Sequence, residues 1–235
     1  MGVPDNIIST IRSGYPRPLR LSDPYRDFSP EELDTIIRKR DADLTDMDLR
    51  NVFQSILPAG EYSECIYFLP LALERILQPK GDYDLCCDVL SWIGDNADGL
   101  KADGLWEKLL SLLEGVFAEL TASFILDDNG HPEGCTMVDA LIKGLNNPRG
   151  GFDGTGDKLL KKYLGAADSY PHAAWLVWSL YYFFYVIDGN SMYLQDVAVD
   201  HALLRKAGDI ILDRAMENDA LLDFWDRKLN RCGIL

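Results

Sequence analysis

The sequence predicts an all-α protein, and three patterns support this prediction. Apolar residues recur at three- and four-residue steps, N-cap residues precede many of these stretches, and no alternating run of β-branched residues lies between turn signals. The chain has 235 residues, of which 47% are hydrophobic and 26% charged, an ordinary globular composition. We expect a single compact multi-helix domain of about ten helices over residues 31–235, with an irregular helical array as the alternative arrangement.

An extended N-terminal arm is expected over residues 1–30, because glycine and four prolines interrupt its second half. Ser29 then supplies an N-cap, with Pro30 at the first helical position and two acids behind it. Thr45 and Asp48 resemble a capping box that starts a helix reaching about residue 57.

Proline and glycine divide the middle of the chain. The helix expected from about residue 62 to 77 contains Pro70, which should kink it or split it near Leu69. Further helices are expected at 82–93, 102–126 and 135–145, the second of them with the longest apolar periodicity.

A glycine-rich loop at 146–156 precedes helices expected at 157–164, 170–187, 194–216 and 219–230. A subdomain break is considered within 127–156. The apolar run 173–187 spans fifteen residues, which is too short to cross a bilayer as a helix. It therefore predicts a buried central helix whose aromatic side chains belong to the core, with an apolar ligand pocket as the alternative.

The negative charge is concentrated in one stretch of the chain. The whole sequence carries a net charge of −15, and residues 41–139 hold 20 acidic and 5 basic side chains. Residues 1–40 and 140–235 are nearly balanced. A concentrated negative field accelerates encounter with a basic protein and disfavours nucleic acid and anionic membranes. A solvated acidic face is the alternative interpretation.

The predicted partner is therefore a basic protein, with no nucleic acid and no membrane involved. Carboxylates between residues 82 and 119 are expected to bind it, with two tryptophans as aromatic anchors that slow release. The predicted partner-binding residues are Asp82, Asp84, Asp88, Trp92, Asp95, Asp98, Asp103, Trp106, Glu107 and Glu114.

The N-terminal residues lack the basic and apolar regions of a signal peptide. The five cysteines are odd in number and irregularly spaced, which does not match a disulfide framework. Both features predict a reducing, cytoplasmic location.

One segment carries a resemblance. Tyr67-Phe68-Leu69-Pro70, followed after two residues by Leu73-Glu74, resembles a Y-F-L-P-x-x-L-E motif of uncharacterised bacterial all-helical proteins. The similarity covers about residues 44–124. It implies a bacterial, cytoplasmic, helical protein and brings no catalytic residues with it.

No pattern predicts a catalytic residue, a metal site or a cofactor. His131, His172 and His201 lack H-E-x-x-H spacing, and paired C-x-x-C units and a G-x-S-x-G elbow are absent. We therefore expect a non-catalytic acidic binding protein, most specifically a bacterial immunity protein that neutralises a basic toxin domain, such as a nuclease, by occlusion. The alternative is an all-α enzyme or small-ligand-binding protein with a site near the glycine-rich loop at 146–158.

Overall fold

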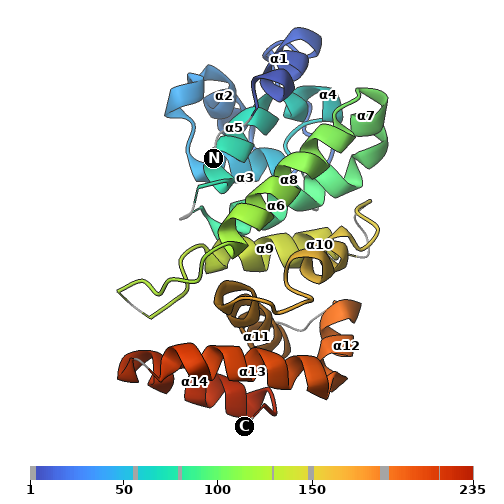
Figure 1. The fold of residues 1–235 in the computed structure, drawn as a ribbon. Helices are drawn as coiled ribbons and strands as arrows, with labels where there is room; N and C mark the ends of the chain where they lie inside the picture. The colour runs from blue at the N-terminus through green and yellow to red at the C-terminus, as the bar shows by residue number, and fades with distance from the viewer. Residues whose placement is uncertain are drawn as a thin grey trace. The chain divides into compact units, whose positions relative to one another are not determined.

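The structure is a computed structural model that describes residues 4–54, 58–78, 81–128, 130–147, 151–185, 191–216 and 218–234. Within these ranges the chain is all-α, as predicted, with one isolated bridge between Leu126 and Pro132 and no strand (Figure 1). Among the described residues, twelve α-helices have seven residues or more, against about ten expected. No helix in these ranges is long and apolar enough to cross a membrane.

The chain divides into two compact units. The first contains the described residues of Met1–Val116 and Arg149–Phe152, and the second those of Phe117–Pro148 and Asp153–Leu235. The subdomain break considered within 127–156 includes the described residues of 149–152, which are assigned to the first unit, although the segments on either side belong to the second. The other point of division lies inside a helix, after Val116, where the sequence has no loop signal.

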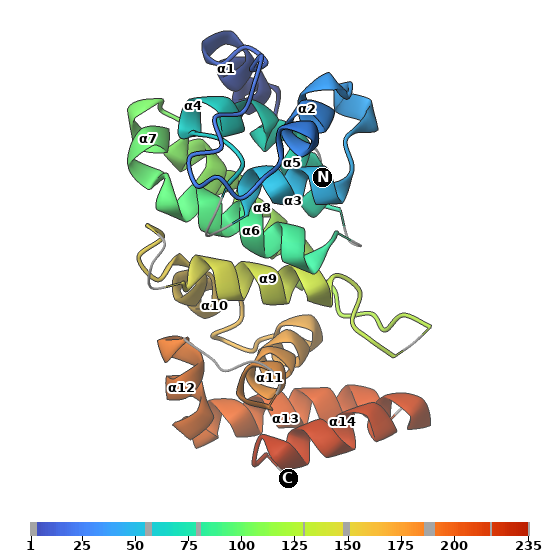
Figure 2. The ribbon, with the colours of Figure 1, turned by 180° about the vertical axis from the view of Figure 1, so that it is seen from behind.

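The first unit is built from eight helices, seen at the blue-to-green end of the chain in both views (Figure 2). They are α1 (Asp5–Gly14), α2 (Pro30–Arg38), α3 (Asp46–Phe53), α4 (Tyr62–Cys65), α5 (Leu69–Ile76), α6 (Tyr83–Asp95), α7 (Ala97–Ala102) and α8 (Trp106–Thr121), whose last residues belong to the second unit. Phe53, Phe68 and Leu49 are among its fully buried side chains.

The extended arm predicted for residues 1–30 is wrong over its first half, because α1 occupies Asp5–Gly14. Ile7 and Ile11 lie one helical turn apart and are both buried, so tertiary packing stabilises a helix with weak start signals. Residues 15–28 contain no regular element, as the prolines predicted.

Local signals predicted several boundaries correctly. Capping boxes form at Ser29 with Glu32 and at Thr45 with Asp48. The helix containing Pro70 is split, because a 3-10 segment, Ile66–Phe68, separates α4 from α5.

Two expected helices are shorter or divided. The helix predicted from 102 to 126 begins only at Trp106, because Gly104 adopts a φ of 68° and ends the preceding helix α7. The same helix, α8, ends at Thr121, five residues earlier than predicted. The helix predicted over 194–216 is broken at Asp200, whose side chain accepts a 3.0 Å hydrogen bond from the Leu203 amide and caps a new helix.

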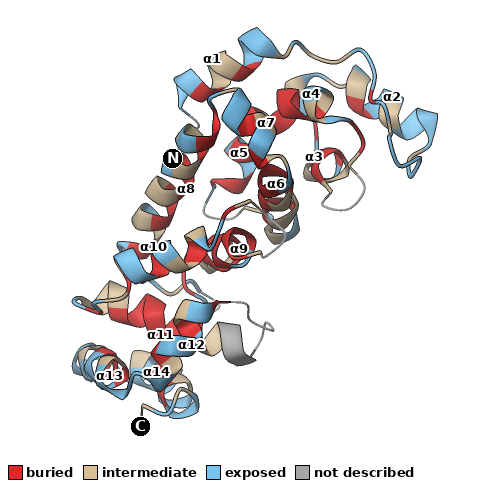
Figure 3. Cartoon of the chain, turned by 90° about the vertical axis from the view of Figure 1, so that its right-hand side faces the viewer, coloured by how far each residue is buried: buried red, intermediate tan, exposed pale blue. Residues whose placement is uncertain are grey.

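The second unit contains six helices besides the end of α8. They are α9 (Cys135–Leu145), α10 (Thr155–Tyr163), α11 (Tyr170–Tyr185), α12 (Met192–Val199), α13 (His201–Ala215) and α14 (Asp219–Arg231). Residues 173–180 of α11 are buried throughout, as predicted from their unbroken apolar run (Figure 3). Phe124 packs against the rings of Trp175 and Trp225 at centroid distances of 5.1 and 5.3 Å, which places these aromatic residues in the core.

Candidate functional site

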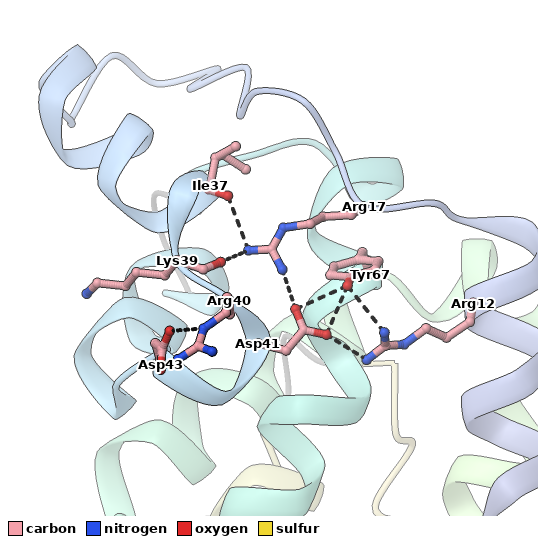
Figure 4. Close-up of polar contacts among 8 residues, drawn as sticks. All are labelled: Arg12, Arg17, Ile37, Lys39, Arg40, Asp41, Asp43 and Tyr67. Atoms are coloured by element: carbon pink, nitrogen blue, oxygen red, sulfur yellow. Dashed lines mark hydrogen bonds and ion pairs between the residues drawn. The ribbon is translucent and has the colours of Figure 1, made fainter.

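Two arginines of the N-terminal segment, Arg12 and Arg17, are paired with one carboxylate, Asp41 (Figure 4). Arg12 Nη2 donates to Asp41 Oδ2 at 3.0 Å, and Arg17 Nη1 donates to Oδ1. The Tyr67 hydroxyl donates to the same carboxylate at 3.0 Å, and both guanidinium groups lie over the Tyr67 ring. This cluster fixes α1 to the 3-10 turn Asp41–Asp43 and uses cations that would otherwise offset acids elsewhere in the unit.

Two of the predicted partner-binding acids are already paired. Arg50 on α3 lies 3.2 Å from Asp84 and 3.3 Å from Asp88, both on α6. Arg50 and Asp88 are mostly covered, so this contact joins two helices of the core as well as neutralising charge.

Two further predicted acids have structural partners. Asp82 caps α6 by accepting a 2.7 Å hydrogen bond from the Leu85 amide. Asp103 accepts hydrogen bonds from the hydroxyls of Tyr15, at 2.7 Å, and Tyr62, at 2.5 Å. Burial, and then the Asp103 carboxylate, raise the pKa of Tyr62 far above its ordinary value, so it remains a donor.

Trp92 and Trp106, the two tryptophans predicted as aromatic anchors, are buried. Trp92 is 3% exposed and Trp106 is 7% exposed. Trp92 lies on the same face of α6 as the buried Val89, and Trp106 stacks on Phe152 at a centroid distance of 5.3 Å. Both tryptophans therefore belong to the buried core of the first unit.

The remaining predicted acids keep their charge at the surface. Asp95, Asp98 and Glu107 are exposed and follow one another around the turns that join α6, α7 and α8. Among the described residues only Lys101 forms an ion pair with any of them, at 3.8 Å from Asp98. We name these three residues the acidic edge. Glu114, the last predicted site residue, is half-buried on α8.

A cavity of about 360 Å³ opens beside the acidic edge, within the first unit. Its lining includes Tyr25, Glu61, Tyr62, Trp92, Asp95 and Asn96. We name it the Tyr62 cavity. Only Trp92 and Asp95 were predicted as site residues. Tyr25, 55% exposed within the proline-rich segment, is an accessible aromatic side chain of the kind that the two tryptophans were expected to supply.

Comparisons with protein-family models, with curated proteins and with solved structures find no match for this chain. The resemblance to uncharacterised bacterial helical proteins therefore stays a prediction. The functional argument depends on the residues alone.

The glycine-rich loop at 146–158 is only partly described, since residues 148–150 lie outside the described ranges. Asp157 has a structural role within its own unit. It receives hydrogen bonds from Asn146 Nδ2 at 2.9 Å, from the Ser191 hydroxyl at 2.5 Å and from the Tyr193 amide at 3.1 Å. These contacts leave the Asp157 carboxylate little capacity to bind a ligand at this loop.

The histidines do not form a common site. His131 and His201 are exposed, and His172, in the first turn of α11, lies 2.8 Å from Asp168. Across the described ranges no three side chains of His, Cys, Asp or Glu are grouped so that they could hold a metal ion.

The pKa values of Asp139 and Lys228, in the second unit, are shifted strongly from their ordinary values. Burial raises the pKa of Asp139, on α9, to about 8. The nearby Trp178 indole has no acceptor at hydrogen-bonding distance among the described residues, so it lowers this pKa only a little. Burial lowers the pKa of Lys228 to about 8, and its ammonium lies 3.5 Å from the centre of the Phe224 ring.

Proposed function

We propose that this chain is a non-catalytic binding protein that captures a basic protein, most specifically a bacterial immunity protein that neutralises a basic toxin domain such as a nuclease. The observation that carries the proposal is the acidic edge. Its three carboxylates are exposed, while Arg12, Arg17 and Arg50 are paired with carboxylates outside it.

Charge distribution explains how such a surface would act. Exposed carboxylates attract a basic surface over roughly a Debye length and raise the association rate by about 10- to 1000-fold. Since a nuclease binds phosphate through cationic side chains, a partner that covers those cations with carboxylates would occlude the substrate. Release would then be governed by apolar and aromatic contacts, for which Tyr25 is the exposed candidate.

The alternative, an enzyme or small-ligand protein with its site at 146–158, has less support. Asp157 is engaged by three groups of its own unit, and the aromatic residues of α11 up to Leu180 are buried core.

Capture from the cells that produce the chain tests the proposal. The tagged protein is used as bait at about 0.1 M and about 1 M salt, where the Debye length falls from about 10 to about 3 Å. We expect one basic protein in equimolar amount at low salt and its loss at high salt. Expression of that protein should harm cells, and co-expression of this chain should protect them. Absence of a basic partner at either salt concentration would contradict the proposal.

The location of the surface is tested by matched variants. Asp95→Asn, Asp98→Asn and Glu107→Gln together remove the acidic edge, whereas Asp196→Asn, Asp209→Asn and Asp213→Asn remove three exposed charges from α12 and α13. We expect the first triple variant to lose capture and the second to retain it. Equal loss in both would show that net charge, and not the acidic edge, attracts the partner.

A further inference from the structure

The Tyr62 cavity has rigid aromatic walls. The ring of Tyr62 lies parallel to that of Trp92, with an interplanar angle of 4° and a centroid distance of 5.6 Å. Its hydroxyl is held by Asp103, and α7 packs so closely that a Cβ on Gly99 would lie 3.0 Å from the ring. A side chain held at both its face and its hydroxyl loses little entropy when a ligand binds against it.

The cavity also holds a carboxylate without a partner. The Asp95 carboxylate forms no hydrogen bond or ion pair with another described residue, although partial burial raises its pKa. Glu61 adds a second carboxyl group to the lining, and none of the described lysines or arginines contributes to it. A carboxylate in this position is stabilised by a cation that enters the cavity.

The size and the aromatic lining of the cavity indicate which kind of cation it can bind. A volume of about 360 Å³ lies at the lower end of the range for ligand cavities, and suits a single side chain better than a cofactor. A guanidinium is flat, stacks on aromatic faces and donates two parallel hydrogen bonds to a carboxylate. A lysine ammonium is a compact, strongly hydrated charge that uses an aromatic wall less well.

We propose that the Tyr62 cavity binds an arginine side chain of the basic partner, stacked on the exposed ring of Tyr25 and paired with Asp95. This inference rests on the proposed function and specifies its contact. The acidic edge would attract the partner, and insertion of the arginine would fix its orientation.

Short peptides test the inference without the partner. Acetyl-Gly-Arg-Gly-amide, and the same peptide with lysine or glutamine in place of arginine, are titrated into the 235-residue protein. Binding is followed by the amide chemical shifts of the protein in NMR. We expect saturable shifts at Tyr62 and Asn96 with the arginine peptide, weaker binding of the lysine peptide and none of the glutamine peptide. Binding should also lower the pKa of Asp95, since a cation favours its charged form.

Matched variants supply the control. Asp95→Asn should weaken arginine-peptide binding about tenfold, the equivalent of one charge-assisted hydrogen bond. Asp209→Asn removes the same charge from an exposed position on α13, outside the acidic edge and the cavity, and should leave the affinity within about twofold. Equal weakening by both variants, equal binding of the lysine peptide, or no shifts at the cavity would overturn the inference.

The two proposals can fail separately. If the peptide does not bind but a basic partner is captured and the acidic edge is required, only the cavity inference fails. If the peptide binds as expected but the cells yield no basic partner, the cavity is an arginine site and the proposed function fails.

Discussion

Asp139 makes the stability of the second unit depend on pH. This carboxyl is 7% exposed on α9, and burial raises its pKa from 3.8 to about 8. In the unfolded chain it ionises near pH 3.8, so between that pH and 8 the folded unit holds one more proton than the unfolded chain. The free energy of unfolding therefore falls as pH rises through this window, and stays level above it.

The magnitude follows from the proton linkage. Each pH unit within the window costs about 1.4 kcal/mol, so Asp139 should lower the free energy of unfolding by roughly 2.5 kcal/mol between about pH 5 and about pH 7. Asp139→Asn keeps the shape of the side chain and cannot ionise. The free energy of unfolding of the variant, relative to that of the wild type, should therefore increase by the same amount from about pH 5 to about pH 7. Cys135 and Tyr182, which face Asp139, have raised pKa values and titrate above this interval.

Urea unfolding of wild type and variant, followed by circular dichroism at several pH values, measures the difference. Asp209→Asn, the same change at an exposed position on α13, serves as the control for the substitution itself. A constant difference between wild type and Asp139→Asn over the whole interval would refute the argument from burial.

Three other predictions concern packing and charge. Trp92→Ala should destabilise the first unit by about 3–5 kcal/mol in urea, because it empties a core position; a loss below about 1 kcal/mol would contradict that placement. Asp41→Asn should release Arg12 and Arg17 at a cost of about 2 kcal/mol and reduce hydrogen-exchange protection in α1, whereas unchanged protection would show that the cluster does not hold this helix. The Lys228 ammonium, followed by NMR, should lose its proton near pH 8; a midpoint near its ordinary 10.5 would show that the aromatic rings around it do not desolvate it.

Local chemistry made part of this fold predictable. Capping at Ser29 and Thr45 and the break at Pro70 depend on neighbouring residues, and each lies where the sequence placed it. Helix α1 was missed because its stability comes from burial of Ile7 and Ile11 against distant segments. The break at Asp200 was missed because an acid inside an apolar periodic stretch has no strong stop signal.

The candidate site was predictable only in its charge. The carboxylates of residues 82–119 can be counted from sequence, but Arg50, which neutralises Asp84 and Asp88, lies more than 30 residues before them. The Tyr62 cavity combines side chains from segments near residues 25, 61 and 95. Such a combination arises from tertiary packing, for which a single sequence carries no local pattern.

The association rate constant with the captured partner tests the central claim most directly. It is measured for the wild type, the acidic-edge triple variant and the α12–α13 triple variant across a salt series. We predict that loss of the acidic edge slows association by at least about tenfold at low salt and flattens its salt dependence, while the other variant behaves as the wild type. An unchanged rate after removal of Asp95, Asp98 and Glu107 charges would contradict the account.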